Sequence, residues 1–357
     1  MSKERIISTA QAIREATAQA MQADPRVVVI GEGVPDPKGI FGTTLGLLDE
    51  FGSNRVFDMP VAENGMTGVV IGASLTGMRP VLTHQRVDFS LYSFDQIINN
   101  AAKWRFMFAD QACVPIVIRM VIGRGWGQGA QHSQSLQALF AHIPGLKVVM
   151  PATPYDAKGL LLEAIRDDDP VIFLEHRWTH GFTGYVPENS YTIPFGEADV
   201  KREGSDITIV SSSYMTIECM RAEEMLRAHG IFAEVVDLRT LIPLDEETIL
   251  KSVKKTGRLL VVDSGWKTGG FGAEIVARVT EKAWDSLLVH PERIALPDEN
   301  SPSAPALTEM YYPTYASIVS VVVRMVGGEH DDVLKDLARN TSDLPHDVPD
   351  PSFTGPF

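Results

Sequence analysis

The sequence is poor in cysteine, with only Cys113 and Cys219 among its 357 residues and no CxxC pair. This scarcity excludes a disulfide framework and a cysteine-rich zinc module, and it favours a reducing, cytoplasmic location. No apolar run approaches the ~18 residues that cross a bilayer, and the N-terminal segment lacks the apolar block of a signal peptide. We therefore expect no association with a membrane.

Positive charge is also in deficit. Lys plus Arg number 32 against 46 for Asp plus Glu, a formal net charge of -14, which disfavours a general affinity for nucleic acid or anionic lipid. Hydrophobic residues, in contrast, make up 44% of the chain beside 22% charged residues, a balance typical of a globular protein. The length predicts two domains.

Short apolar runs alternate with helical patterns through the first half of the chain. The runs Val27–Ile30, Pro80–Thr83, Pro115–Val121 and Pro170–Glu175 have the continuous hydrophobicity of strands that are buried on both faces of a parallel sheet. Because helical patterns separate them, residues 1–190 are predicted to form a doubly wound, mostly parallel α/β domain.

A second, smaller α/β domain is predicted for residues 191–326, after a polar stretch that contains proline. Strand and helix patterns alternate there, at residues 206–211, 216–229, 233–238, 246–256 and 259–263. Residues 327–357 have little apolar periodicity and four prolines near the end. This composition predicts an extended or disordered tail.

Two loop segments carry candidate chemistry. Glu63 lies between a proline-terminated extended segment and a glycine-rich helix start, a place where α/β sheets present ligand-contacting groups. Its alternative role is that of an ordinary carboxylate at a helix N-terminus. His132 ends a glycine-rich loop after a buried strand, where it can move a proton or bind an anion near neutral pH, or simply face water.

Six motifs in order carry a family resemblance: GEGV, RVFDMPVAENGMTG, FDQIINNAAKW, GAQHSQS, HIPGLKVVMPATPYDAKGLL and TGGFGAEI. Together they closely resemble the beta subunit of the two-chain, thiamine-diphosphate-dependent 2-oxoacid dehydrogenase component, of pyruvate and branched-chain type. That family belongs to the transketolase superfamily, and the resemblance covers roughly residues 5–325. It implies a transketolase pyrimidine-binding domain followed by a transketolase C-terminal domain.

The resemblance assigns cofactor contacts. It implies that Glu63 bonds the pyrimidine ring nitrogen of thiamine diphosphate, so that the adjacent amine can remove the thiazolium proton. It implies that Glu32 shares or relays that proton; the alternative is that Glu32 is an ordinary acidic residue at a strand end. It also implies that Phe89 packs on the pyrimidine face; the alternative is that Phe89 is an aromatic residue of the core. Val61 and Gln85, in matching segments, are predicted to contact the cofactor too.

The resemblance also assigns a histidine and a metal. It links His132 to transfer of the acyl group to a lipoyl arm, as proton donor or as partner to the intermediate's oxygen. It implies a potassium ion on the backbone carbonyls of Ile116, Ala164, Asp167 and Asp169. Carbonyl oxygens suit a hard ion, although the acidic run at these last positions is otherwise an ordinary solvated turn.

No GDG segment occurs in the chain, although thiamine-diphosphate enzymes use that segment and a following Asn to hold magnesium. The resemblance resolves this with a separate alpha subunit that carries the GDG motif and the Mg²⁺ ion. The cofactor is then shared within an alpha2beta2 heterotetramer. A small 2-oxoacid substrate and a lipoyl acyltransferase are the further partners implied.

Departures from the family pattern, at Val121–Trp126, Asp263–Trp266 and Asp298–Ala304, keep more than one function open. His84 and Arg86 are placed to read an anionic or hydroxylated substrate, unless they are only a charged strand end. The first hypothesis is decarboxylation of a 2-oxoacid with acyl transfer to lipoamide. The second is a carboligase or transketolase-like enzyme that passes a two-carbon unit to an aldehyde or sugar. A non-catalytic scaffold is the third, and the two candidate catalytic residues argue against it.

Overall fold

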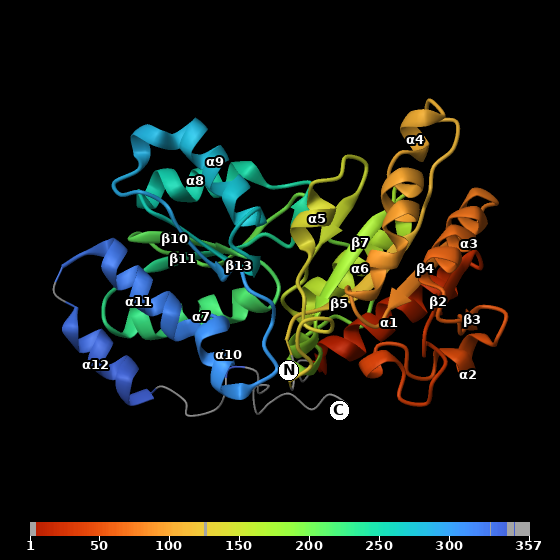
Figure 1. The fold of residues 1–357 in the computed structure, drawn as a ribbon, viewed down its shortest axis with the longest axis horizontal. Coiled ribbons are helices and arrows are strands. Elements are labelled where there is room, and N and C mark those ends of the chain that lie inside the picture. The colour runs from red at the N-terminus through yellow and green to blue at the C-terminus, as the bar shows by residue number, and fades with distance from the viewer. Residues whose placement is uncertain (1–4, 125–126, 329, 341–345, 347–357) are drawn as a thin grey trace.

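The computed structural model describes residues 5–124, 127–328, 330–340 and 346, and Figure 1 shows two α/β units side by side. The larger sheet has seven strands: β2 (Val27–Gly31), β3 (Val56–Phe57), β4 (Arg79–His84), β5 (Val117–Ile122), β6 (Lys147–Val149), β7 (Val171–His176) and β12 (Thr240–Ile242). Their order is β12-β6-β7-β5-β4-β2-β3. All neighbours are parallel except β12, which pairs antiparallel with β6.

Helices cover both faces of this sheet. Helices α1 (Thr9–Ala23) and α6 (Pro154–Arg166) bury one core with Val29, while α3 (Glu63–Leu75) and α5 (Gln137–Ala141) bury another with Ile30. Successive side chains of a strand point to opposite faces, so a strand covered on both faces is mostly apolar. The predicted doubly wound, mostly parallel arrangement is confirmed.

The smaller sheet has the order β14-β13-β10-β11-β9. Its strands are β9 (Asp199–Arg202), β10 (Ile207–Ser211), β11 (Ala233–Asp237), β13 (Leu259–Trp266) and β14 (Glu292–Leu296). Figure 1 shows α8 (Glu246–Thr256) and α9 (Phe271–Ala283) on one face of this sheet, and α7 (Tyr214–Ala228) and α11 (Tyr315–Val326) on the other. The alternating strands and helices expected in this half are confirmed.

Short elements complete the described chain. They are β1 (Ile6–Ser8) paired with β8 (Thr183–Tyr185), the helical turns η1 (Ile40–Gly42), η2 (Phe89–Ser93), η3 (Gln96–Ala101), η4 (Arg177–Gly181) and η5 (Trp284–Ser286), and helices α2 (Leu47–Phe51), α4 (Trp104–Met107) and α10 (Pro305–Tyr311). No helix among the described residues is long and apolar enough to span a membrane.

The two units are tied together covalently and by charge. After β11 the chain returns to the larger sheet as β12, so the boundary at residue 190 stays a prediction. Lys201 of β9 and Arg239 both pair with Asp156 of α6, at 2.8 and 2.7 Å, and Asp156 is fully buried. A buried carboxylate held by two cations fixes the smaller sheet against α6, because separating them would leave that charge unpaired.

The expectation of an extended or disordered tail is wrong for helix α12 (Asp331–Asn340). Val333 and Leu337 bury against the core formed by α7 and α11. His229, at the end of α7, lies 3.3 Å from Asp332 and 3.1 Å from Asp336. In the sequence, two apolar side chains four residues apart are too few to predict a buried helix. The surface of α7 and α11 supplies the contacts that bury them. Residues 341–345 and 347–357 of the predicted tail lie outside the described chain.

Docking of α12 should weaken as the pH rises. Hydrogen bonds to Asp336 and Asp332 raise the pKa of His229. A raised folded-state pKa gives stability that is complete below about pH 6.5 and lost as the pH passes the raised value. We expect hydrogen exchange of residues 331–340, corrected for intrinsic rates, to accelerate above neutral pH. In His229→Gln this acceleration should vanish, and a variant with the same pH profile as wild type would contradict the docking account.

Candidate active site at the carboxyl edge of the larger sheet

The predicted catalytic and cofactor residues gather at one edge of the larger sheet. Glu32 follows β2, Gln85 follows β4, and His132 lies in the loop after β5. These strands are neighbours and parallel, so their carboxyl ends meet at the same edge. This is the edge at which open α/β sheets bind ligands.

Three carboxylates form the first half of the site. Glu63 begins α3 and is only 7% exposed. The Oε1 atom of Glu32 is buried and accepts no hydrogen bond from the residues that the structure describes. Burial, followed by repulsion from Glu63 and Asp58, raises the pKa of Glu32. A carboxyl group whose pKa is raised in this way is better suited to holding a proton.

Hydrogen bonds fix the backbone around these carboxylates. The backbone N–H groups of Gly33 and Met59 both donate to Oδ1 of Asp58, each at 2.9 Å. Nε2 of Gln85 donates to the backbone carbonyl of Glu32 at 3.0 Å. Gln85, predicted to contact the cofactor, therefore holds the Glu32 turn in place with its side-chain nitrogen.

The second half of the site is a pair of rings. The Phe89 and His132 rings meet edge to face, with centroids 5.4 Å apart. Gln134 Nε2 donates to Asp88 Oδ1 at 2.6 Å, which holds the histidine loop against the segment after β4. The hydroxyl of Thr67 in α3 donates to Ser93 in η2 at 3.0 Å, so the helix that begins at the buried carboxylate packs on the turn that begins at Phe89.

The mouth of the site is open on one side. Val61 is 82% exposed, so within this chain its side chain is covered by little. Gly65 and Gly72 of α3 have no heavy atom within 4 Å of the position where a Cβ would stand, and Val69 on the same helix is 59% exposed. Small and apolar groups thus face outward beside the carboxylates.

Of the two residues proposed to read the substrate, only Arg86 is a cation. Burial lowers the pKa of His84 to about 4, so this imidazole is neutral and enclosed. The sequence reasoning assigned no role to Arg124 or Arg177, which are 5% and 4% exposed. The available signal was their position, because each follows a buried strand of the same parallel sheet.

The carbonyls predicted to hold potassium lie at the opposite, amino edge of the sheet. The N–H of Asp167 donates to the carbonyl of Ala164 at 3.3 Å, and the N–H of Val171 to that of Ile116 at 2.9 Å. The N–H of Asp169 donates to Oδ1 of Asp167 at 2.8 Å. These bonds bring the four predicted positions together, but they separate them from Glu63 and His132 by the length of the strands.

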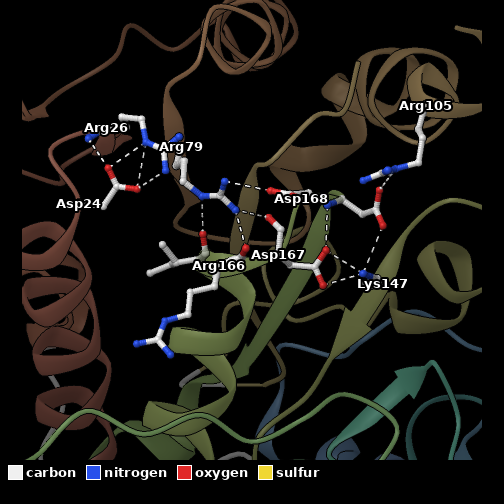
Figure 2. A network of polar contacts seen from close by, with 10 residues as sticks. Asp24, Arg26, Arg79, Arg105, Lys147, Arg166, Asp167 and Asp168 are labelled. Atoms are coloured by element: carbon white, nitrogen blue, oxygen red, sulfur yellow. Dashed lines mark hydrogen bonds and ion pairs between the residues drawn. The ribbon is translucent and has the colours of Figure 1, made fainter. Parts of the chain in front are cut away.

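Cationic side chains also occupy this amino edge, as Figure 2 shows. Arg79 donates to the carbonyls of Ile165, Arg166 and Asp167, at 2.9, 2.6 and 2.7 Å. Lys147 pairs with the Asp167 carboxylate at 2.6 Å. The oxygen donors fit a hard ion, and these cations already neutralise part of the negative end of α6. No cluster of three or more His, Cys, Asp or Glu side chains placed to hold a metal occurs in the described residues.

Fold and site together define a two-domain protein of transketolase type. Residues 5–180 match the family model "Transketolase, pyrimidine binding domain", and residues 196–318 match "Transketolase, C-terminal domain". A solved structure described as a split gene transketolase, inactive beta4 tetramer, has the same fold, with a TM-score of 0.74 at 24% identity. That alignment covers 90% of this chain and 98% of the other.

The chain belongs to the family of dehydrogenase beta subunits. It is 45% identical to the beta subunit of acetoin:2,6-dichlorophenolindophenol oxidoreductase of Cupriavidus necator, over 91% of this chain and 99% of the relative. It is 41% identical to the beta subunit of the pyruvate dehydrogenase E1 component of Rickettsia felis and 43% identical to that of 2-oxoisovalerate dehydrogenase of Bacillus subtilis. Both of these alignments cover 89% of this chain and 98% of the relative.

Removing the Glu63 charge should flatten the pH dependence of stability. The pKa of Glu32 is raised, so its contribution to stability is complete below about pH 4.3 and is lost as the pH rises through the folded-state value. Glu63→Gln removes one cause of the rise. We expect urea denaturation to show a smaller loss of unfolding free energy between acidic and neutral pH in this variant. Glu224→Gln, at an exposed position, is the control, and equal pH profiles for both variants would refute the coupling.

Proposed function

We propose that this chain is the beta subunit of a thiamine-diphosphate-dependent 2-oxoacid dehydrogenase, which decarboxylates a 2-oxoacid and transfers the acyl group to lipoamide. The observation that carries this proposal is the pair of neighbouring carboxylates, Glu32 and Glu63, at the carboxyl edge of the sheet. The relatives' names specify acetoin, pyruvate and 2-oxoisovalerate.

The chain's own residues suit the thiamine half of the chemistry. Thiamine diphosphate, when bound, supplies the electron sink that decarboxylation needs. In this proposal Glu63 offers a carboxylate oxygen to the protonated pyrimidine nitrogen, and Glu32, with its raised pKa, stores or relays the proton. Phe89 packs on the pyrimidine face. Gln85 positions Glu32 through its backbone carbonyl, and Val61 contacts the cofactor from the exposed side.

His132 supplies the second proton. Its ring contacts Phe89, so it lies beside the face on which the cofactor is proposed to pack. Imidazole exchanges protons near neutral pH, which suits donation to the substrate oxygen as the acyl group moves to the lipoyl arm.

An alpha subunit completes the site in this proposal. The outward face of α3, with Gly65, Val69 and Gly72 beside the exposed Val61, leaves apolar surface and backbone uncovered at the site mouth, as a protein interface would. We assign to the alpha subunit the GDG motif and the Mg²⁺ ion, in an alpha2beta2 assembly that serves a lipoyl acyltransferase. Potassium on the carbonyls at the amino edge and a cytoplasmic location complete the proposal.

Glu63→Gln should abolish turnover of the complex with the alpha subunit. Losing the carboxylate removes the proton partner of the pyrimidine, and we expect a fall of about 100-fold or more, as for general acid–base groups. The measurement is lipoamide-dependent NADH formation together with transfer to an aldehyde acceptor. Glu224→Gln should retain the wild-type rate, and an unchanged rate in Glu63→Gln would remove the cofactor assignment.

The same two assays separate the dehydrogenase from the carboligase. We expect wild-type complex to reduce lipoyl domain, because the chain belongs to the dehydrogenase family. Activity with an aldehyde and none with a lipoyl domain would replace the dehydrogenase by a carboligase or transketolase-like enzyme.

Cofactor binding by the chain alone should be weak. The Mg²⁺-holding motif is absent from the sequence, so the diphosphate lacks its partner until the alpha subunit is present. We expect titration calorimetry with Mg²⁺ and thiamine diphosphate to show tight binding by the complex only. Tight, Mg²⁺-dependent binding by the isolated chain would contradict the division of the site.

A further inference from the structure

Three arginines converge behind the histidine loop. Arg86 follows β4, Arg124 follows β5 and Arg177 follows β7, and these strands lie next to one another in the sheet. All three side chains are buried, at 3%, 5% and 4% exposure. Arginine is rarely this buried without a partner of opposite charge, so the cluster needs a physical explanation.

Aromatic rings contact the guanidinium group of Arg124, but its Nε–H has no hydrogen-bond acceptor among the described residues. Its guanidinium carbon lies 4.3 Å from the centroid of the Trp178 ring and 4.6 Å from that of Tyr312. Ring contacts of this kind stabilise a cation, but they leave the N–H groups unused. Nε of Arg124 is buried, and within the described chain it donates no hydrogen bond.

Arg86 and Arg177 share one acceptor. Both donate to Oε1 of Gln128, Arg177 at 3.0 Å, and Arg86 also donates to the carbonyl of Gly123 at 3.0 Å. Desolvation lowers the pKa of Arg86 to about 10 and, together with the Arg86 charge, that of Arg177 to about 9. Among the described residues, Arg86 thus donates to neutral oxygens where a carboxylate would be expected.

Among the described residues, the acidic groups near the cluster balance its charge only in part. Glu175 is already held by Arg119 at 2.6 Å and by His180 at 2.9 Å. Asp88 interacts with Arg86 at longer range, and among the described residues no carboxylate lies within 4 Å of Arg86 or the neighbouring arginine after β5. A buried charge without a counterion loses its hydration and gains little in return.

A small cavity lies at the edge of this cluster. Its volume is about 20 Å³, enough for one water-sized group. Hydrogen-bonding groups line it, contributed by Arg124, Ser133, Ser135, His176, Ser264 and Tyr312. The backbone N–H of Trp178 donates to Nδ1 of His176, which leaves the proton of the neutral imidazole on Nε2.

We propose that this cavity takes one oxygen atom of an oxyanion, a carboxylate or phosphate group, that the substrate carries in addition to its reacting carbon. The bound anion would supply the missing counter-charge and accept from the Arg124 edge. Ser133 and Ser135 belong to the loop of His132, so an anion held there positions its substrate beside the proposed proton donor. That last step rests on the proposed function, whereas anion binding does not.

Calorimetric titration of the full chain with inorganic phosphate and with malonate tests the binding. We expect both Arg124→Gln and Arg86→Gln to weaken binding at least tenfold, with Arg124→Lys retaining part of it. Arg26→Gln, an exposed arginine on the far edge, should bind as wild type. Circular dichroism checks that each variant folds. If Arg124→Gln does not fold, the binding measured for Arg86→Gln decides the test. Absence of binding to wild type, or equal binding by the variants, overturns the site.

Kinetics of the complex with its alpha subunit identify the source of the anion. Substrates are paired with and without a second anionic group: dicarboxylic against monocarboxylic 2-oxoacids, and phosphorylated against unphosphorylated aldehydes. We expect Arg124→Gln to reduce kcat/KM at least tenfold for the anionic member of one pair and less than twofold for its partner. Equal effects on both members would overturn the substrate assignment, even where phosphate binding persists. Total inactivity of wild type would contradict the proposed function and leave the calorimetric result standing.

Discussion

The bidentate ion pair between Arg119 of β5 and Glu175 of β7 lies at the centre of the larger sheet, and much of the site depends on it. The two side chains are 1% and 2% exposed, with nitrogen–oxygen distances of 2.6 and 3.0 Å. Charges so deep are tolerated only in such geometry. The pair fixes two adjacent strands near their carboxyl ends, and the histidine loop and the two flanking arginines extend from those ends.

The carboxyl edge of this sheet carries the candidate active site, whereas the amino edge carries structural ion pairs and hydrogen bonds. The carboxyl edge carries groups whose charge is costly: Glu32 with its raised pKa, Glu63 at the helix start, and the buried Arg86 and Arg124, which form no ion pair within 4 Å among the described residues. At the amino edge, Arg79 and Lys147 meet carbonyls and carboxylates directly. Uncompensated charge at one edge and compensated charge at the other is the pattern expected when only the first binds ligands.

Much of the fold was predictable because burial on both faces leaves a local trace. Val27–Ile30 had to be a parallel strand, since an uninterrupted apolar run of that length has few other uses. Helix α12 was not predictable, because Val333 and Leu337 are buried only through their contact with the surface made by α7 and α11. The burial of His84 was not predictable for the same reason: its sequence neighbours are polar, yet the folded chain encloses it.

The two α/β units, the family resemblance and the candidate residues follow from the amino-acid sequence, because strand burial and motif order depend on consecutive residues. Which of those residues meet depends on the folded chain. It set Glu32 against Glu63, Phe89 against His132, and Arg86 beside Arg177 at the shared oxygen of Gln128. The physical reason is that proximity across a parallel sheet depends on strand order, and no stretch of chain encodes that order locally.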